Sequence, residues 1–158
     1  MSERVEQLLA RLRKGMDRTA GIFSALDPAQ WDVVLYSEPY PWTVRDLLAH
    51  FLSAEEGLLQ IAQDIAAGGP GAPSDFDYNA FNAAEQQRLA GIPPQQILAD
   101  LVAARQRTQA WVAGLQEADL ERSGRHPALG EVDLETLLNA IYGHQLLHMR
   151  DLAQCLSL

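Results

Sequence analysis

The chain has 158 residues with a single cysteine, and its 12 Lys+Arg against 21 Asp+Glu leave a formal net charge of −9. This charge argues against nucleic acid or an anionic membrane as a partner, because a phosphate-binding surface must be basic. One cysteine excludes an internal disulfide scaffold, and we expect one cytoplasmic domain over residues 1–158 with no signal peptide and no apolar run of the roughly 20 residues that a membrane span needs.

The first predicted helix lies close to the N-terminus. Apolar residues from Val5 to Phe23 recur at intervals of three and four, so they share one helical face. Asp27 and Pro28 are expected to end this helix, and a proline-rich loop over residues 36–41 follows.

The second predicted helix begins at a clear capping signal. Thr43 is followed three residues later by Asp46, which is a capping-box pattern. An apolar stripe over residues 44–65 continues until a Gly-Gly pair, and residues 68–76 are expected to be a loop. A short helix is expected within residues 77–90.

Two more helices complete the expected fold. Pro94 suits the first turn of a third helix whose apolar stripe covers residues 97–115, and residues 116–132 are read as a loop. Asp133 is the expected N-cap of a fourth helix over residues 134–155. No strand pattern of useful length is present, so the sequence predicts an all-α four-helix bundle, with a crossover between its second and third helices.

Three of the four histidines lie on the predicted helices. His144 and His148 are four residues apart, so they share one helical face, and both lie on an otherwise apolar stripe. His50 lies on the inner face of the second helix. A lone histidine on such a face is more often a core residue with one hydrogen bond, and a His-x3-His pair alone is often coincidence.

Three inward imidazoles without a carboxylate partner are costly to bury, and a divalent cation would satisfy all three. Three protein ligands leave a coordination position open, which is typical of catalytic rather than structural sites. All-imidazole ligation suits zinc, nickel, iron or copper better than magnesium or calcium.

Two segments resemble the DinB/YfiT-like superfamily, and the related N-domain of mycothiol-dependent maleylpyruvate isomerase is similar. They are residues 42–50, Trp-Thr-Val-Arg-Asp-Leu-Leu-Ala-His, and residues 142–152, which contain the His-x3-His pair. The resemblance implies a bundle with a crossover, often dimeric, that holds one divalent metal (zinc, nickel or iron) on His50, His144 and His148. In the isomerase branch the middle ligand is a Glu, so His144 favours the all-His branch.

The resemblance also implies a class of reaction. Characterised members are mostly transferases that depend on a low-molecular-weight thiol such as mycothiol, bacillithiol or glutathione, so we expect a metal-dependent thiol S-transferase that acts on a small molecule as a homodimer. Two alternatives are a metal-dependent hydrolase and a non-catalytic bundle for metal binding or dimerisation. Motifs for a nucleophile elbow, a P-loop, a dinucleotide site and a di-iron site are all missing.

Residues beside the histidines are candidates for supporting roles. Tyr40 and Trp42 are expected to line a substrate pocket, although Trp42 also suits packing at the start of the second helix. Asp46 and Asp151 are candidates to orient an imidazole, with Arg150 beside them. The alternative is that Asp46 is only the capping acid and the others form exposed ion pairs.

Several other polar residues are expected to stay outside the site. Tyr142 points away from the metal face, and Glu55 and Glu56 are expected to face water. Cys155 continues the histidine stripe and is expected to be a small buried hydrophobe rather than a ligand. The fourth histidine, His126, lies in a predicted loop and is expected to be solvated.

Overall fold

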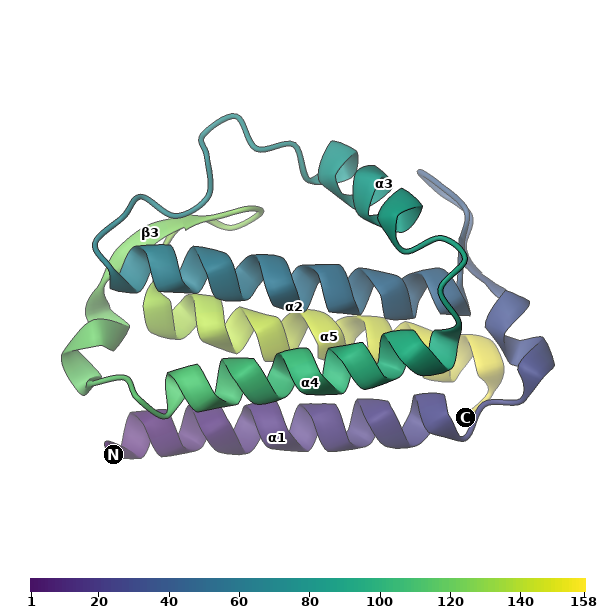
Figure 1. Cartoon of the computed structure of the whole chain (residues 1–158), viewed down its shortest axis with the longest axis horizontal. Helices are drawn as coiled ribbons and strands as arrows, with labels where there is room; N and C mark the ends of the chain where they lie inside the picture. Colours follow the sequence, from purple (N-terminus) through teal and green to yellow (C-terminus); the bar gives the residue numbers. More distant parts are fainter.

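Helix is the dominant secondary structure of the chain, as its apolar periodicity predicted. The computed structural model describes residues 1–158, and four long helices lie side by side along one axis (Figure 1). No helix combines the length and apolar character that a membrane crossing requires. The elements in chain order are α1 (Glu3–Ser24), η1 (Pro28–Asp32), β1 (Val34–Tyr36), β2 (Trp42–Thr43), α2 (Val44–Ala66), α3 (Tyr78–Arg88), α4 (Pro94–Val112), η2 (Glu117–Glu121), β3 (Ser123–His126), β4 (Gly130–Asp133) and α5 (Leu134–Leu156).

The connections between the long helices cross the bundle. Both α1 and α2 pack against α4 and α5, so α1 and α2 lie diagonally opposite each other. Helices α1 and α5 run in one direction and α2 and α4 in the other (Figure 1). Because α2 and α4 are parallel neighbours, the chain between them returns along the outside of the bundle and carries α3 there. The predicted four-helix bundle with a crossover is confirmed.

Two short antiparallel strand pairs, which the sequence did not predict, flank the bundle. Strand β1 pairs with β2, and β3 pairs with β4. The expectation of no strands was wrong because strands of two to four residues are too short to display an alternating pattern. The region 116–132, expected to be a loop, therefore holds η2, β3 and most of β4.

The predicted helix starts are confirmed by their caps. The backbone N–H of Asp46 donates to the Thr43 hydroxyl at 3.2 Å, and the Thr43 N–H donates to the Asp46 carboxylate at 2.9 Å. The Asp133 carboxylate accepts from the Thr136 N–H at 2.7 Å, and Pro94 is the first residue of α4. These caps fix where α2 and α5 begin.

A buried ionic network lies among the four long helices. Arg105 on α4 donates twice to the Glu55 carboxylate on α2, both at 2.8 Å, and also to the Leu12 carbonyl on α1 and the Gln145 amide oxygen on α5. Thr108 donates to the same carboxylate at 2.7 Å. The expectation that Glu55 faces water was wrong, because Arg105 compensates its charge inside the core.

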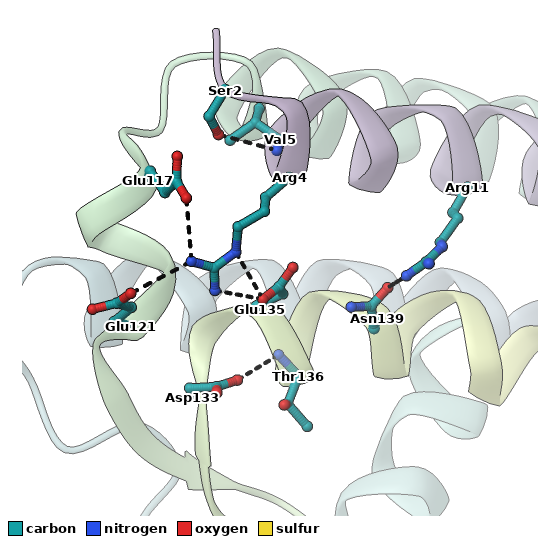
Figure 2. Close-up of polar contacts among 10 residues, drawn as sticks. All are labelled: Ser2, Arg4, Val5, Arg11, Glu117, Glu121, Asp133, Glu135, Thr136 and Asn139. Atoms are coloured by element: carbon teal, nitrogen blue, oxygen red, sulfur yellow. Dashed lines mark hydrogen bonds and ion pairs between the residues drawn. The ribbon is translucent and has the colours of Figure 1, made fainter.

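Polar contacts at the surface join α1 to α5 and to η2 at the end where the chain begins. The Arg4 guanidinium lies 2.6 Å from the Glu135 carboxylate, 3.4 Å from that of Glu121 and 3.6 Å from that of Glu117 (Figure 2). Surface ion pairs of this kind contribute only about 0–1 kcal/mol each. These contacts lie at one end of the bundle. The histidines lie in the other half, where α2 begins and α5 ends.

Candidate metal centre

Three histidines from distant parts of the chain meet between α2 and α5. His50 lies in the second turn of α2, and His144 and His148 occupy successive turns of α5. The Nε2 atom of His144 is 3.0 Å from that of His50 and 3.1 Å from that of His148. One ligand atom from each ring lies within 4.8 Å of the other two. The two helices are antiparallel neighbours, so the start of α2 faces the second half of α5, as convergence of these rings requires.

Tyr36 and Asp151 set the tautomer of His148. The Tyr36 hydroxyl is 2.5 Å from the Asp151 carboxylate and 2.7 Å from Nδ1 of His148. Burial and the bond to Asp151 raise the pKa of Tyr36 well above its ordinary value, so the phenol keeps its proton. Its single proton goes to Asp151, and its oxygen accepts from the His148 Nδ1–H. The Nε2 atom of His148 therefore carries a lone pair directed at the cluster.

The close Nε2 contacts cannot all be hydrogen bonds. If His144 Nε2 is protonated, its one N–H can point straight at His50 or at His148, but not at both. If it is unprotonated, its lone pair faces the lone pair of His148. A cation between the three nitrogens removes this conflict, so the donor set fits a bound metal. At metal–nitrogen distances of about 2.0–2.1 Å, two ligands of one ion lie roughly 3–4 Å apart, which matches the two short separations.

The environment keeps these imidazoles in the form that a metal requires. Burial, followed by the neighbouring histidines, lowers the pKa of His50 to about 3, and burial together with His148 lowers the pKa of His144 to about 4. Burial also lowers the pKa of His148. The Trp42 ring covers His50, with ring centroids 4.8 Å apart. The rings are thus neutral at pH 7, and neutral imidazole is the metal-binding form.

A pocket of about 480 Å³ opens beside His148. One wall comes from the segment of residues 36–42, and the opposite wall comes from α3. Tyr40 and Trp42, the residues proposed from the sequence for a substrate pocket, line this cavity, and Asp46 lines it as well. The histidine cluster therefore borders, through His148, a space large enough for a small molecule.

The predicted supporting residues have different fates. Asp151 does reach a histidine, but through the Tyr36 hydroxyl rather than directly. Asp46 caps α2 and lies 3.9 Å from Arg45, and it makes no hydrogen bond to an imidazole. Arg150 is exposed and makes neither a hydrogen bond nor an ion pair, so the expectation of a role beside the site has no contact to support it.

Three further expectations can be compared with the structure. The Tyr142 ring lies against Gly15 of α1, away from the histidines, as predicted. Cys155 is exposed, so the expectation of a buried hydrophobe was wrong. His126 is not simply solvated, because its Nδ1 accepts from the backbone N–H groups of Ala128 and Leu129, both at 3.0 Å.

Sequence reasoning missed Tyr36, although it contacts the site directly. Tyr36 lies 112 residues from His148 in sequence, and only the path of β1 beside α5 brings the two together. The one available signal was its place at the start of the proline-rich loop that also carries Tyr40.

Replacement of Tyr36 by phenylalanine is expected to weaken metal binding by about 10- to 100-fold, the usual loss when a partner that orients a ligand is removed. The phenyl ring keeps the packing but leaves the His148 Nδ1–H without its acceptor. Competition titration of zinc against a chelator measures the dissociation constant. The matched control is Tyr40→Phe, because the Tyr40 hydroxyl makes no hydrogen bond within the protein. Equal zinc affinity in wild type and Tyr36→Phe would contradict the orienting role.

The metal-free protein is expected to lose stability as the pH falls below about 6.5. The unfolded chain binds protons on His50 and His144 near the ordinary pKa of 6.5, whereas the folded chain does not until pH values of about 3 and 4. The unfolded state therefore gains protons first, which costs roughly 2 kcal/mol per histidine between pH 7.5 and 5. Urea unfolding with a chelator measures this slope, and it should be shallower in His50→Gln.

Known structures share this architecture at low sequence identity. YfiT from Bacillus subtilis, described as a probable metal-dependent hydrolase with an unusual four-helix bundle topology, is 18% identical, with a TM-score of 0.80 over 98% of this chain and 87% of that one. Mycothiol-dependent maleylpyruvate isomerase is 18% identical, with a TM-score of 0.77 over 96% of this chain, which spans 63% of the isomerase. An uncharacterised protein from Clostridium difficile 630 is 14% identical, with a TM-score of 0.72 over 98% of this chain and 96% of that one.

These likenesses establish the fold. No curated protein sequence matches the chain. The family model of the DinB superfamily, however, matches residues 5–152, which is nearly the entire sequence. The chain therefore belongs to the DinB superfamily.

Proposed function

We propose that the protein is a metal-dependent enzyme that holds one divalent cation on His50, His144 and His148 and uses it in a low-molecular-weight-thiol-dependent S-transfer. The observation that carries the proposal is the convergence of three neutral Nε2 atoms whose close contacts no arrangement of protons can satisfy. Zinc, nickel and iron are the ions that such a set of imidazoles suits.

The residues around the histidine cluster have different roles in the proposed reaction. A divalent cation supplies Lewis acidity, which lowers the pKa of a thiol or a water molecule and yields a nucleophile at neutral pH. The chain positions the rings: Tyr36 and Asp151 hold the proton of His148 on Nδ1, and Trp42 shields His50 from water. The pocket beside His148 provides the volume in which an electrophile can be held.

A thiol co-substrate is supported by the structural likeness to the mycothiol-dependent isomerase. Mycothiol, bacillithiol and glutathione are the thiols to compare. The second candidate is hydrolysis, which the higher structural similarity to YfiT favours. The same site serves either reaction, since the nucleophile is a thiol in one case and water in the other.

One experiment separates these reactions. Untagged protein loaded with zinc, nickel or iron is incubated with 1-chloro-2,4-dinitrobenzene and each thiol, and separately with p-nitrophenyl acetate. Metal-dependent consumption of a thiol supports transfer, and metal-dependent ester cleavage without thiol supports hydrolysis. His144→Ala is the control in both assays. Stoichiometric metal with neither activity would favour the non-catalytic alternative.

A further inference from the structure

The pocket beside His148 carries negative charge and no positive charge. Glu38 and Asp46 are the only acidic residues that line it, and neither lysine nor arginine is present in its lining. Asp46 lies 3.9 Å from the Arg45 guanidinium, which offsets part of its charge. Glu38 is exposed and makes neither an ion pair nor a hydrogen bond, so no positive group of the protein is paired with its charge. An anionic substrate group in this pocket would meet repulsion with no attraction to balance it.

Of the three arginines that lie within two residues of a lining residue in the sequence, two are paired elsewhere, and the third, Arg150, is unpaired but does not line the pocket. Arg45 donates through Nη2 to the backbone carbonyls of Leu89 and Ile92, both at 2.6 Å. Arg88, at the end of α3, pairs with the carboxylates of Glu85 at 2.6 Å and Glu56 at 3.2 Å. The hydrogen-bond acceptors of these two guanidinium ions all lie outside the pocket lining.

Aromatic rings form much of the remaining wall. Tyr36, Tyr40 and Trp42 all line the pocket, and the rings of Tyr36 and Trp42 lie 6.4 Å apart at an interplanar angle of 61°. Aromatic faces attract cations, and quaternary ammonium groups are bound in proteins by sets of such rings. The combination of aromatic rings and an unpaired carboxylate therefore favours a positively charged guest.

Side-chain amides on α3 supply hydrogen-bond acceptors on the opposite wall. Asn79 and Asn82 make no side-chain hydrogen bond, so their amides remain available to a ligand. Gln86 donates through its amide nitrogen to the Asp46 carbonyl at 2.8 Å, while its buried Oε1 has no partner. The amide oxygens of Asn79 and Asn82 could accept the N–H groups of a primary ammonium, whereas Oε1 of Gln86 has no exposed surface and would first have to rotate toward the pocket.

From the residues that line the pocket, we infer that it binds the alkylammonium group of a substrate and excludes carboxylates. The reaction that such a substrate undergoes rests on the proposed function, but its binding does not require the metal. A small amine-bearing thiol or electrophile would place its ammonium between Glu38 and the aromatic rings, with its other end toward His148. Dicarboxylate electrophiles would be poor substrates for the same reason, and a thiol that carries carboxylates, such as glutathione or bacillithiol, would have to bind with those groups outside this pocket.

The test uses four small hydroxyl-bearing probes on the metal-free protein: choline, ethanolamine, glycolate, and ethylene glycol as the uncharged reference. Binding is followed by the ¹⁵N–¹H NMR signal of the Trp42 indole, identified by its disappearance in Trp42→Phe. Choline and ethanolamine are expected to bind about tenfold more tightly than glycolate, and high salt should reduce the difference. If choline binds more tightly than ethanolamine, the aromatic rings contribute the larger part of the ammonium affinity. If ethanolamine binds more tightly than choline, the amides contribute the larger part. Equal or tighter binding of glycolate overturns the inference.

Variants of Glu38 test the source of the selectivity. Glu38→Gln is expected to weaken ammonium binding about three- to tenfold, and Glu38→Lys should reverse the preference toward glycolate. Glu131→Gln, which removes an exposed carboxylate in the β3–β4 hairpin, should leave it unchanged. Unchanged ammonium binding in both Glu38 variants would also overturn the inference. Ammonium binding without metal binding would contradict the proposed function but leave this pocket assignment intact. Metal binding without any charge preference among the probes would contradict the pocket assignment but leave the proposed function intact.

Discussion

Replacement of His144 by alanine is expected to reduce bound metal from about one equivalent per chain to almost none. His144 is the central ring of the cluster, because its Nε2 atom lies 3.0 Å from that of His50 and 3.1 Å from that of His148. Its removal leaves two donors on different helices, and a loss of about 100-fold or more in affinity is expected, beyond that for a residue that only orients a ligand. Elemental analysis of untagged, dialysed protein measures the content directly.

Stability provides an independent measurement of the same change. A metal at 100 times its dissociation constant stabilises the folded state by about 2.7 kcal/mol, so zinc should raise the unfolding midpoint of the wild-type protein and not that of His144→Ala. The matched control is His126→Asn, because His126 lies outside the cluster and asparagine can still accept from the backbone of the hairpin. Wild-type protein that binds no zinc, nickel or iron would refute the metal centre.

Replacement of Arg105 by alanine is expected to destabilise the metal-free protein by about 3–5 kcal/mol. Arg105 and Glu55 are only 1% and 3% exposed, and the guanidinium supplies two hydrogen bonds to that carboxylate. Loss of Arg105 leaves an uncompensated buried charge, and it also removes the donors to the Leu12 carbonyl and the Gln145 amide. Urea unfolding in the presence of a chelator measures the change.

Two further variants distinguish lost pairing from lost packing. Arg105→Met combined with Glu55→Leu removes both charges and keeps the volume, so it should recover most of the stability. Arg107→Ala, which removes an exposed guanidinium 3.8 Å from Glu56, should change stability by less than about 0.5 kcal/mol. A loss below about 1 kcal/mol in Arg105→Ala would show that the network contributes little.

The buried network also affects the candidate metal centre, because Gln145 lies on α5 directly before the turn that carries His148. Gln145 accepts from Arg105 on one side of α5, while its sequence neighbour His144 points at His50. Successive helical residues differ in direction by a fixed rotation, so anchoring one fixes the other. The double variant at Arg105 and Glu55 is therefore expected to fold but to bind metal less tightly than the wild type.

What could be predicted from the sequence was local or periodic. The caps at Thr43 and Asp133 were visible because a short polar side chain satisfies backbone groups within its own first turn. The inward direction of His50, His144 and His148 followed from their positions on apolar stripes. The same reasoning gave the wrong exposure for Glu55, because the position of a residue on its helix does not show whether a buried arginine on another helix pairs with it.

The sequence alone thus determined where the helices lie along the chain, which of their faces point inward and that three histidines lie on those faces. Each of these features depends on residues within a few helical turns of one another. Tertiary structure alone decided which side chains complete the site. Tyr36 meets His148 across 112 residues, and α3 faces the segment of residues 36–42 across the pocket. Such contacts depend on how the helices cross and on where the connecting segments return, and these follow from the packing of the whole bundle rather than from any local pattern.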